Sequence, residues 1–100
     1  MASQVRDNQR SHRFELEVDD QLAKAWYRQQ GNVITFTHTD VPDALAGQGV
    51  GSRLAKGALD AVRSAGQRVI AMCPFIAAYI KKHHEYDDLL VKPDEAATPR

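Results

Sequence analysis

The chain has 100 residues, 43% of them hydrophobic, which suits one domain with a modest core. Thirteen basic residues balance thirteen acidic ones. Proteins that bind nucleic acid or anionic membranes normally have a surplus of basic residues, so the balanced charge disfavours both kinds of partner. A single cysteine forms no intrachain disulfide, the four histidines have no metal-site spacing, and no apolar run approaches the roughly 20 residues of a membrane-spanning helix. We therefore expect a cytoplasmic monomer that binds no metal.

The first half of the chain predicts strands. Residues 1–12 are polar without periodicity, and we expect a flexible leader there. Residues 13–18 alternate between polar and apolar, which predicts a half-buried strand. Residues 21–30 fit helical spacing, but they also fit period two between two turn signals, which favours a strand that forms a hairpin with the first. Residues 33–41 are rich in β-branched side chains and predict a third strand, which Pro42 ends.

The second half predicts helices around one buried strand. Residues 50–65 place apolar side chains on one helical face, and Gly66 is a natural stop after them. Residues 68–73 are almost wholly apolar, as in a buried strand that lies parallel to the strand before the helix. Pro74 then begins a second, short helix that ends near residue 83.

The remaining residues predict little regular structure. We expect residues 86–91 to dock as an extended segment. Residues 92–100 contain two prolines, which is typical of a flexible tail. The main domain is therefore expected over residues 13–91.

A glycine-rich stretch at residues 46–52 opens the long helix and is the best candidate binding site. Its three alternate glycines allow positive φ and close approach of a ligand, and the amides of a helix N-terminus bind anions, most often phosphate. The alternative is a turn that only begins the helix. The P-loop pattern requires a lysine before Ser52, and the dinucleotide fingerprint requires a third glycine three residues after the second, so both fit poorly.

The same stretch, Ala46-Gly47-Gln48-Gly49-Val50-Gly51, resembles the coenzyme A loop of the GNAT superfamily of N-acetyltransferases. Ala46 departs from the family pattern because it has no polar side chain for the phosphates. The block Cys73-Pro74-Phe75, with Tyr79 behind it, looks like the small single-domain branch with a Cys-Pro-Phe motif, and so do His38–Pro42 and His84–Tyr86. The resemblance covers residues 13–90.

This resemblance implies an α+β fold with a mixed, mainly antiparallel sheet in the order β-β-β-α-β-α and helices packed on it. The implied activity is transfer of an acetyl group from acetyl-coenzyme A to an unidentified amine or other small nucleophile. Two other classes of function stay open: a non-catalytic module that binds coenzyme A or acyl-coenzyme A, and a thiol sensor that uses Cys73.

The resemblance also implies which residues hold the coenzyme. The pyrophosphate is expected on the loop and the first turn of the helix, at Gly47, Gln48, Gly49, Val50, Gly51 and Ser52. Arg53 would add a charge-assisted contact, or it is a solvated surface charge. Thr39 and Val41 would bind the pantetheine arm with free strand amides, with the Val41 N–H directed at the thioester carbonyl; ordinary sheet pairing of these amides is the alternative.

Three residues are candidates for the chemistry. Cys73 precedes a proline-initiated helix, whose N-terminus favours a thiolate that takes the acetyl group and passes it on; a buried, inert cysteine is the alternative. His38 is a candidate general base or a structural histidine, and strand parity places it on the apolar face unless a bulge intervenes. Tyr79 is a candidate acid that returns a proton to the coenzyme thiolate, or a core residue.

Overall fold

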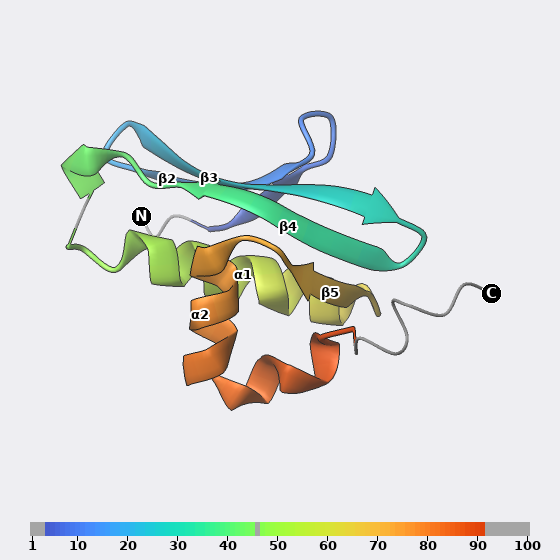
Figure 1. Cartoon of the computed structure of the whole chain (residues 1–100). Coiled ribbons are helices and arrows are strands. Elements are labelled where there is room, and N and C mark those ends of the chain that lie inside the picture. The colour runs from blue at the N-terminus through green and yellow to red at the C-terminus, as the bar shows by residue number, and fades with distance from the viewer. Residues whose placement is uncertain (1–3, 46, 92–100) are drawn as a thin grey trace.

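One five-stranded sheet forms the upper layer of the molecule in Figure 1. The computed structural model describes residues 4–45 and 47–91. The strands lie in the order β1-β2-β3-β4-β5; β1 to β4 pair antiparallel, and β5 lies parallel to β4. Their bounds are β1 (Arg6–Asn8), β2 (Arg13–Val18), β3 (Gln21–Gln30), β4 (Val33–Asp40) and β5 (Arg68–Ala71).

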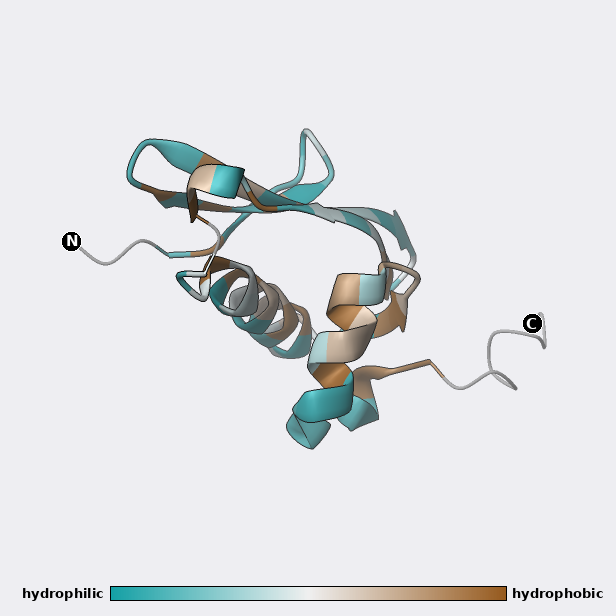
Figure 2. Ribbon diagram, turned by 60° about the vertical axis from the view of Figure 1, so that its left-hand side comes forward, coloured by the Kyte–Doolittle hydropathy of each residue, from teal (hydrophilic) through white to brown (hydrophobic). Residues whose placement is uncertain are grey.

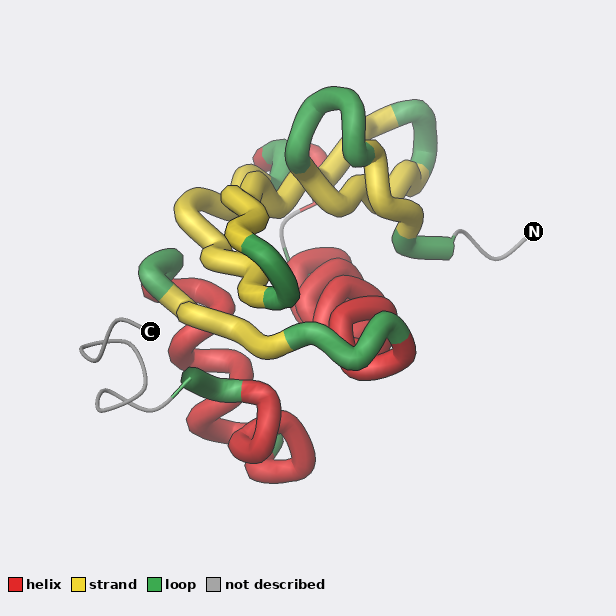
Figure 3. Tube along the Cα trace, turned by 90° about the vertical axis from the view of Figure 1, so that its right-hand side faces the viewer, coloured by secondary structure: helices red, strands yellow, loops and turns green. Residues whose placement is uncertain are grey.

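Two helices form the second layer, and both lie on the same side of the sheet (Figures 1 and 3). Helix α1 (Val50–Ser64) connects β4 to β5, and α2 (Pro74–Lys82) follows β5. Short 3₁₀ helices precede α1 (η1, Asp43–Leu45) and follow α2 (η2, His84–Leu89). No helix among residues 4–45 and 47–91 has the length and apolar character needed to cross a membrane. The predicted α+β class with a mixed, mainly antiparallel sheet is confirmed.

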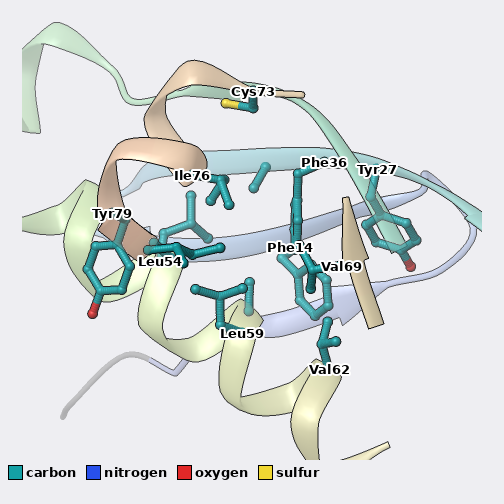
Figure 4. Packing of buried hydrophobic residues seen from close by; sticks show 14 of the residues in the cluster. Phe14, Tyr27, Phe36, Leu54, Leu59, Val62, Val69, Cys73, Ile76 and Tyr79 are labelled. Atoms are coloured by element: carbon teal, nitrogen blue, oxygen red, sulfur yellow. The ribbon is translucent and has the colours of Figure 1, made fainter. Parts of the chain in front are cut away.

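The core lies between the sheet and α1 (Figure 4). Phe14 and Phe36 point from the sheet toward Leu54, Leu59 and Val62 of α1, whose spacing forms one helical face. Each such side chain contributes about 1.5–3 kcal/mol when it is fully buried. The helix ends where the sequence predicts, with Gly66 at φ 70° and its amide bonded to the carbonyl of Arg63.

Residues 21–30 form a strand, as favoured over a helix. Ala23, Ala25 and Tyr27 are buried at period two, whereas Lys24 and Trp26 between them lie on the opposite face of the sheet. Neither helix covers that opposite face, as Figure 1 shows. The strand therefore carries one apolar face and one half-exposed face, which is the alternation that a hairpin with β2 requires.

The expectation of a flexible leader over residues 1–12 is wrong for β1 and its hairpin. β1 pairs with β2, and the Tyr27 hydroxyl donates to Asp7 at 2.5 Å. Val5 packs against α1 at Gly57, where an added Cβ would lie 2.4 Å from a Val5 methyl carbon. These contacts depend on backbone pairing and single side chains, so the segment shows no periodicity in its sequence. Residues 1–3 and the predicted tail at 92–100 lie outside the described residues.

The segment after α2 also differs from its prediction. Residues 86–89 of the expected extended segment belong instead to η2, in which Tyr86 turns inward and its hydroxyl donates to Asp60 of α1 at 2.7 Å. Only Leu90 pairs like a strand, in a parallel bridge to Val69. This arrangement fixes η2 against both α1 and β5.

Glu15 is a buried carboxylate on the otherwise exposed face of the sheet, and it fastens β1. It accepts hydrogen bonds from Arg13 at 2.5 Å and Asn8 at 3.0 Å, and Arg6 lies 3.6 Å away. Burial alone would raise the pKa of Glu15, but these hydrogen bonds and the two positive charges outweigh burial and hold the pKa below its ordinary value of 4.5.

We expect Glu15 to make the fold sensitive to acid. Because its pKa is lowered on folding, its contribution to stability is present above about pH 4.5 and is lost as pH falls through the lowered pKa. Urea unfolding of the wild type and of Glu15→Gln between pH 7 and pH 3 measures this contribution. The wild type should lose more stability than the variant over that interval, and parallel curves would contradict the role of Glu15.

Candidate functional site

The glycine loop adopts a backbone that other residues would strain. Gly47 has φ 81° and Gly49 has φ 73°, both in the left-handed region. Gly49 is the N-cap of α1, and its carbonyl accepts the amide of Arg53 at 3.1 Å. Within the described part of the chain no side chain caps this terminus, so the amides of the first turn are available to an anion.

A hollow of about 290 Å³ joins this loop to the end of β4. Its lining comes from the residue after β4, η1, the loop, the first turn of α1 and the start of α2: Val41, Leu45, Gly47, Gly49, Val50, Gly51, Ser52 and Phe75. The structure therefore brings most of the predicted loop residues together with Val41. Ala46, the position that departs from the family pattern, lies outside the described residues.

Gln48 and Arg53 stand apart from that hollow. The Gln48 amide donates to Leu45 at 3.3 Å and its side chain donates to Ala44 at 3.2 Å, so its polar groups close the turn after η1. Arg53 lines a different hollow, of about 400 Å³, beside Val5. Neither residue lines the loop hollow in this structure, and their expected contacts with the coenzyme phosphates stay predictions.

Strands β4 and β5 separate next to the loop hollow. Their pairing ends at Phe36 and Ala71, where the carbonyl of Phe36 accepts the amides of both Met72 and Cys73, at 3.0 and 2.9 Å. β4 continues to Asp40 paired with β3. The edge of Thr39–Val41 that faces away from β3 therefore looks into the gap between the two strands.

Cys73 lies at this gap. The residue is 2% exposed and forms the N-cap of α2, and its carbonyl accepts the amide of Ala77 at 3.0 Å. Its sulfur lies 3.1 Å from the Thr39 hydroxyl, and either atom can donate the hydrogen bond. Figure 4 shows the sulfur at the top of the core. The sulfur thus lies at the N-terminus of α2, beside the Thr39 hydroxyl and shielded from solvent.

His38 lies on the opposite face of the sheet from Cys73. A β-bulge in β4, opposite Trp26 and Tyr27, shifts the register, so that His38 pairs with Trp26 whereas Phe36 pairs with Tyr27. The imidazole stacks on the Trp26 indole with ring centroids 5.3 Å apart. The bulge thus reverses the parity expected for a regular strand, so the imidazole does not lie beside the Cys73 sulfur in this structure, and a role of His38 as general base stays a prediction.

Tyr79 is a core residue away from the Cys73 sulfur. Its ring stacks on His83 with centroids 4.0 Å apart, and Figure 4 shows its hydroxyl directed away from Cys73. Burial raises the pKa of Tyr79, with a further raising effect of Glu85 and Asp60 and an opposing effect of Lys56. The Tyr79 hydroxyl thus lies apart from Cys73 in this structure, and its role as the acid that returns a proton to the coenzyme thiolate stays a prediction.

Phe75 is a site residue that the sequence reasoning missed. Its side chain is 40% exposed and packs on Gly51, where an added Cβ would lie 2.7 Å from the ring. A glycine inside a helix costs about 1 kcal/mol relative to alanine, so Gly51 in the first turn of α1 was a usable signal of a close neighbour. Among the described residues, no group of histidine, cysteine and acidic side chains could hold a metal ion.

Comparison with known proteins decides the family. A family model described as GCN5-related N-acetyl-transferase matches residues 13–89. The chain belongs to this acetyltransferase family. The fold agrees: an NMR structure from Staphylococcus aureus, described as GCN5-like, superposes on this acetyltransferase domain with a TM-score of 0.68 and 28% identity. That superposition covers 97% of this chain and 96% of the other.

Curated relatives of this acetyltransferase domain match over a shorter stretch. Proteins named NATD1 from human, mouse and chicken are each 37% identical to it over 51 residues, or 51% of this chain. That stretch covers 45% of the human protein and 46% of the mouse and chicken proteins, so the chain spans about half the length of these relatives. The family prediction is confirmed, whereas the finer assignment to a branch with a Cys-Pro-Phe motif stays a prediction.

Proposed function

We propose that this domain transfers the acetyl group of acetyl-coenzyme A to a small nucleophile, in the first instance an amine. The observation that carries the proposal is the short distance along the chain between the loop hollow and the gap between β4 and β5. Val41 lines the hollow, and Thr39, two residues earlier, contacts the sulfur of Cys73. A diphosphate on the first-turn amides of α1 would thus leave the acyl end of its arm beside Cys73.

The proposed reaction has two steps. The Cys73 thiolate attacks the thioester carbonyl, the bond between that carbon and the coenzyme sulfur breaks, and the coenzyme leaves as a thiol after taking one proton. The acceptor amine then attacks acetyl-Cys73, loses a proton and regenerates the cysteine. The Val41 N–H would stabilise the oxyanion, a contact worth about 3 kcal/mol in other enzymes.

A non-catalytic coenzyme A module is the second candidate, and one observation favours it. Neither His38 nor Tyr79 lies beside Cys73, so among the described residues the three expected catalytic groups are not assembled. Such a module would keep the loop hollow and would need no reactive sulfur.

Two measurements on the full chain separate these candidates. NMR titration with coenzyme A should shift the amides of residues 47–53, and incubation with acetyl-coenzyme A should add one acetyl group to Cys73 in the mass spectrum. Shifts without an adduct favour the binding module or direct transfer. Unmoved loop amides would overturn both, and an oxidation-sensitive thiol without coenzyme binding would indicate a sensor.

We expect His38→Ala to leave acetylation of Cys73 unchanged within about twofold, because the sheet separates the imidazole from the sulfur. The rate of appearance of the acetylated chain, followed by mass spectrometry after mixing with acetyl-coenzyme A, tests this. A tenfold slower rate would show that His38 reaches the sulfur in the complex. Loss of turnover with intact acetylation of Cys73 would instead indicate that His38 acts in the second step, the transfer of the acetyl group to the acceptor.

A further inference from the structure

We propose that Lys82 and His83, at the end of α2, bind the 3′-phosphate of coenzyme A. This inference rests on the proposed function and extends it from the pyrophosphate to the adenosine end of the coenzyme. Coenzyme A carries a phosphomonoester on its ribose in addition to the diphosphate. The first turn of α1 supplies amides for one anionic group, so the second requires other donors.

A second hollow directly adjoins the loop hollow. It has a volume of about 120 Å³ and lies between the first turn of α1 and the exposed side of α2. Its lining residues are Ser52, Phe75, Ala78, Tyr79, Lys82 and His83, and it shares Ser52 and Phe75 with the loop hollow. At about 30 Å³ per water molecule, this volume suits a phosphate group and is too small for a whole adenosine.

The lining of this second hollow supplies the donors that a phosphate needs. Ser52 offers a hydroxyl, Lys82 an ammonium group and His83 a ring nitrogen. The imidazole of His83 is held by its stack on the Tyr79 ring, with centroids 4.0 Å apart, so its position does not depend on the ligand. Figure 2 shows that the end of α2 and the start of η2 are hydrophilic, in contrast to the more apolar start of α2.

Lys82 gives this second hollow a positive charge that no ion pair cancels among the described residues. Lys56, on the neighbouring turn of α1, forms an ion pair with Asp60 at 2.8 Å and is thereby neutralised. Within residues 4–45 and 47–91 no acidic side chain forms an ion pair with Lys82. Glu85 is exposed two residues beyond His83 and opposes the site only weakly through solvent.

The adjacent lysine provides a matched control. Lys81 lines a separate groove of about 470 Å³ on another side of α2, with Pro74, Ala77 and Leu90. Lys81 and Lys82 have the same charge, the same helix and adjacent positions, so only their direction differs. An effect of general electrostatic attraction would appear in both variants, whereas a specific phosphate contact would appear only at Lys82.

Calorimetric titrations with coenzyme A and with 3′-dephospho-coenzyme A test the proposal on the wild type, Lys82→Ala and Lys81→Ala at low salt. The wild type should bind coenzyme A about fivefold more tightly than the dephospho form, as for an ion pair worth about 1 kcal/mol. Lys82→Ala should remove that preference by weakening coenzyme A alone, and Lys81→Ala should retain it. His83→Ala should reduce the preference partially.

The outcomes separate this inference from the function on which it rests. If the wild type binds both ligands with equal affinity, or if Lys82→Ala keeps the preference, the 3′-phosphate site is overturned and the coenzyme function stands. If Lys81→Ala reduces the preference as much as Lys82→Ala, the effect is general attraction and the site is likewise overturned. If neither ligand binds, the proposed function itself fails.

Discussion

Replacing Gly49 with valine is expected to lower the affinity for coenzyme A by at least about 100-fold, which corresponds to roughly 3 kcal/mol. Gly49 caps α1 at φ 73°, a conformation that a β-branched residue adopts only with strain. The chain would move out of this conformation and redirect the first-turn amides that the diphosphate requires. Calorimetric titration with coenzyme A measures the loss.

Gly31 offers a control for the strain itself. It turns the chain between β3 and β4 at φ 59°, and like Gly49 it has open space around the position of a Cβ. Gly31→Val should therefore strain the backbone in the same way as Gly49→Val. We expect it to destabilise the fold by about 1–2 kcal/mol while retaining coenzyme binding. Equal loss of binding in the two variants would mean that instability, and not the loop, is responsible.

Replacing Cys73 with alanine is expected to abolish the acetyl adduct and to reduce turnover by at least about 100-fold, since the proposed covalent route has no other acceptor sulfur. The coenzyme should still bind, because Cys73 lies outside the loop hollow. Mass spectrometry after incubation with acetyl-coenzyme A, together with release of free coenzyme in the presence of an amine, measures both effects.

Thr39→Val supplies the matched control for Cys73. It removes the hydroxyl 3.1 Å from the sulfur while nearly preserving the shape of the side chain. The adduct should still form, at a rate reduced several-fold, because the sulfur loses the hydroxyl beside it on β4.

Full turnover by Cys73→Ala would contradict the covalent route and leave direct transfer from the coenzyme to the acceptor.

Much of this architecture follows from local patterns in the sequence. Three patterns were sufficient to predict their elements: the alternation over residues 13–18, the β-branched run before Pro42 and the helical face that ends at Gly66. Each of these elements buries its own apolar face, which leaves a periodic pattern in the sequence. β1 left no such pattern, since three residues of edge strand are held by Asp7, Asn8 and backbone pairing.

The site was harder to predict because single-residue geometry decides it. One extra residue in β4 transfers His38 to the far face of the sheet, and nothing in the residue types at 37–38 marks that bulge. Tyr79 has the helical spacing of a core residue and of a site residue alike. The contact of Phe75 with Gly51 joins positions that are far apart in the sequence, so the sequence offered only the unexplained glycine as a signal.

The uncovered face of the sheet has a practical consequence for experiments. Trp26, the sole tryptophan of the chain, stands there between Arg13 and His38, with cation centres of Arg13 and Lys24 5.8 and 5.6 Å from its ring. Its ultraviolet emission is therefore a built-in optical reporter of events at the bulge. A change in this emission when a ligand binds would report contact with the face opposite Cys73, without any added label.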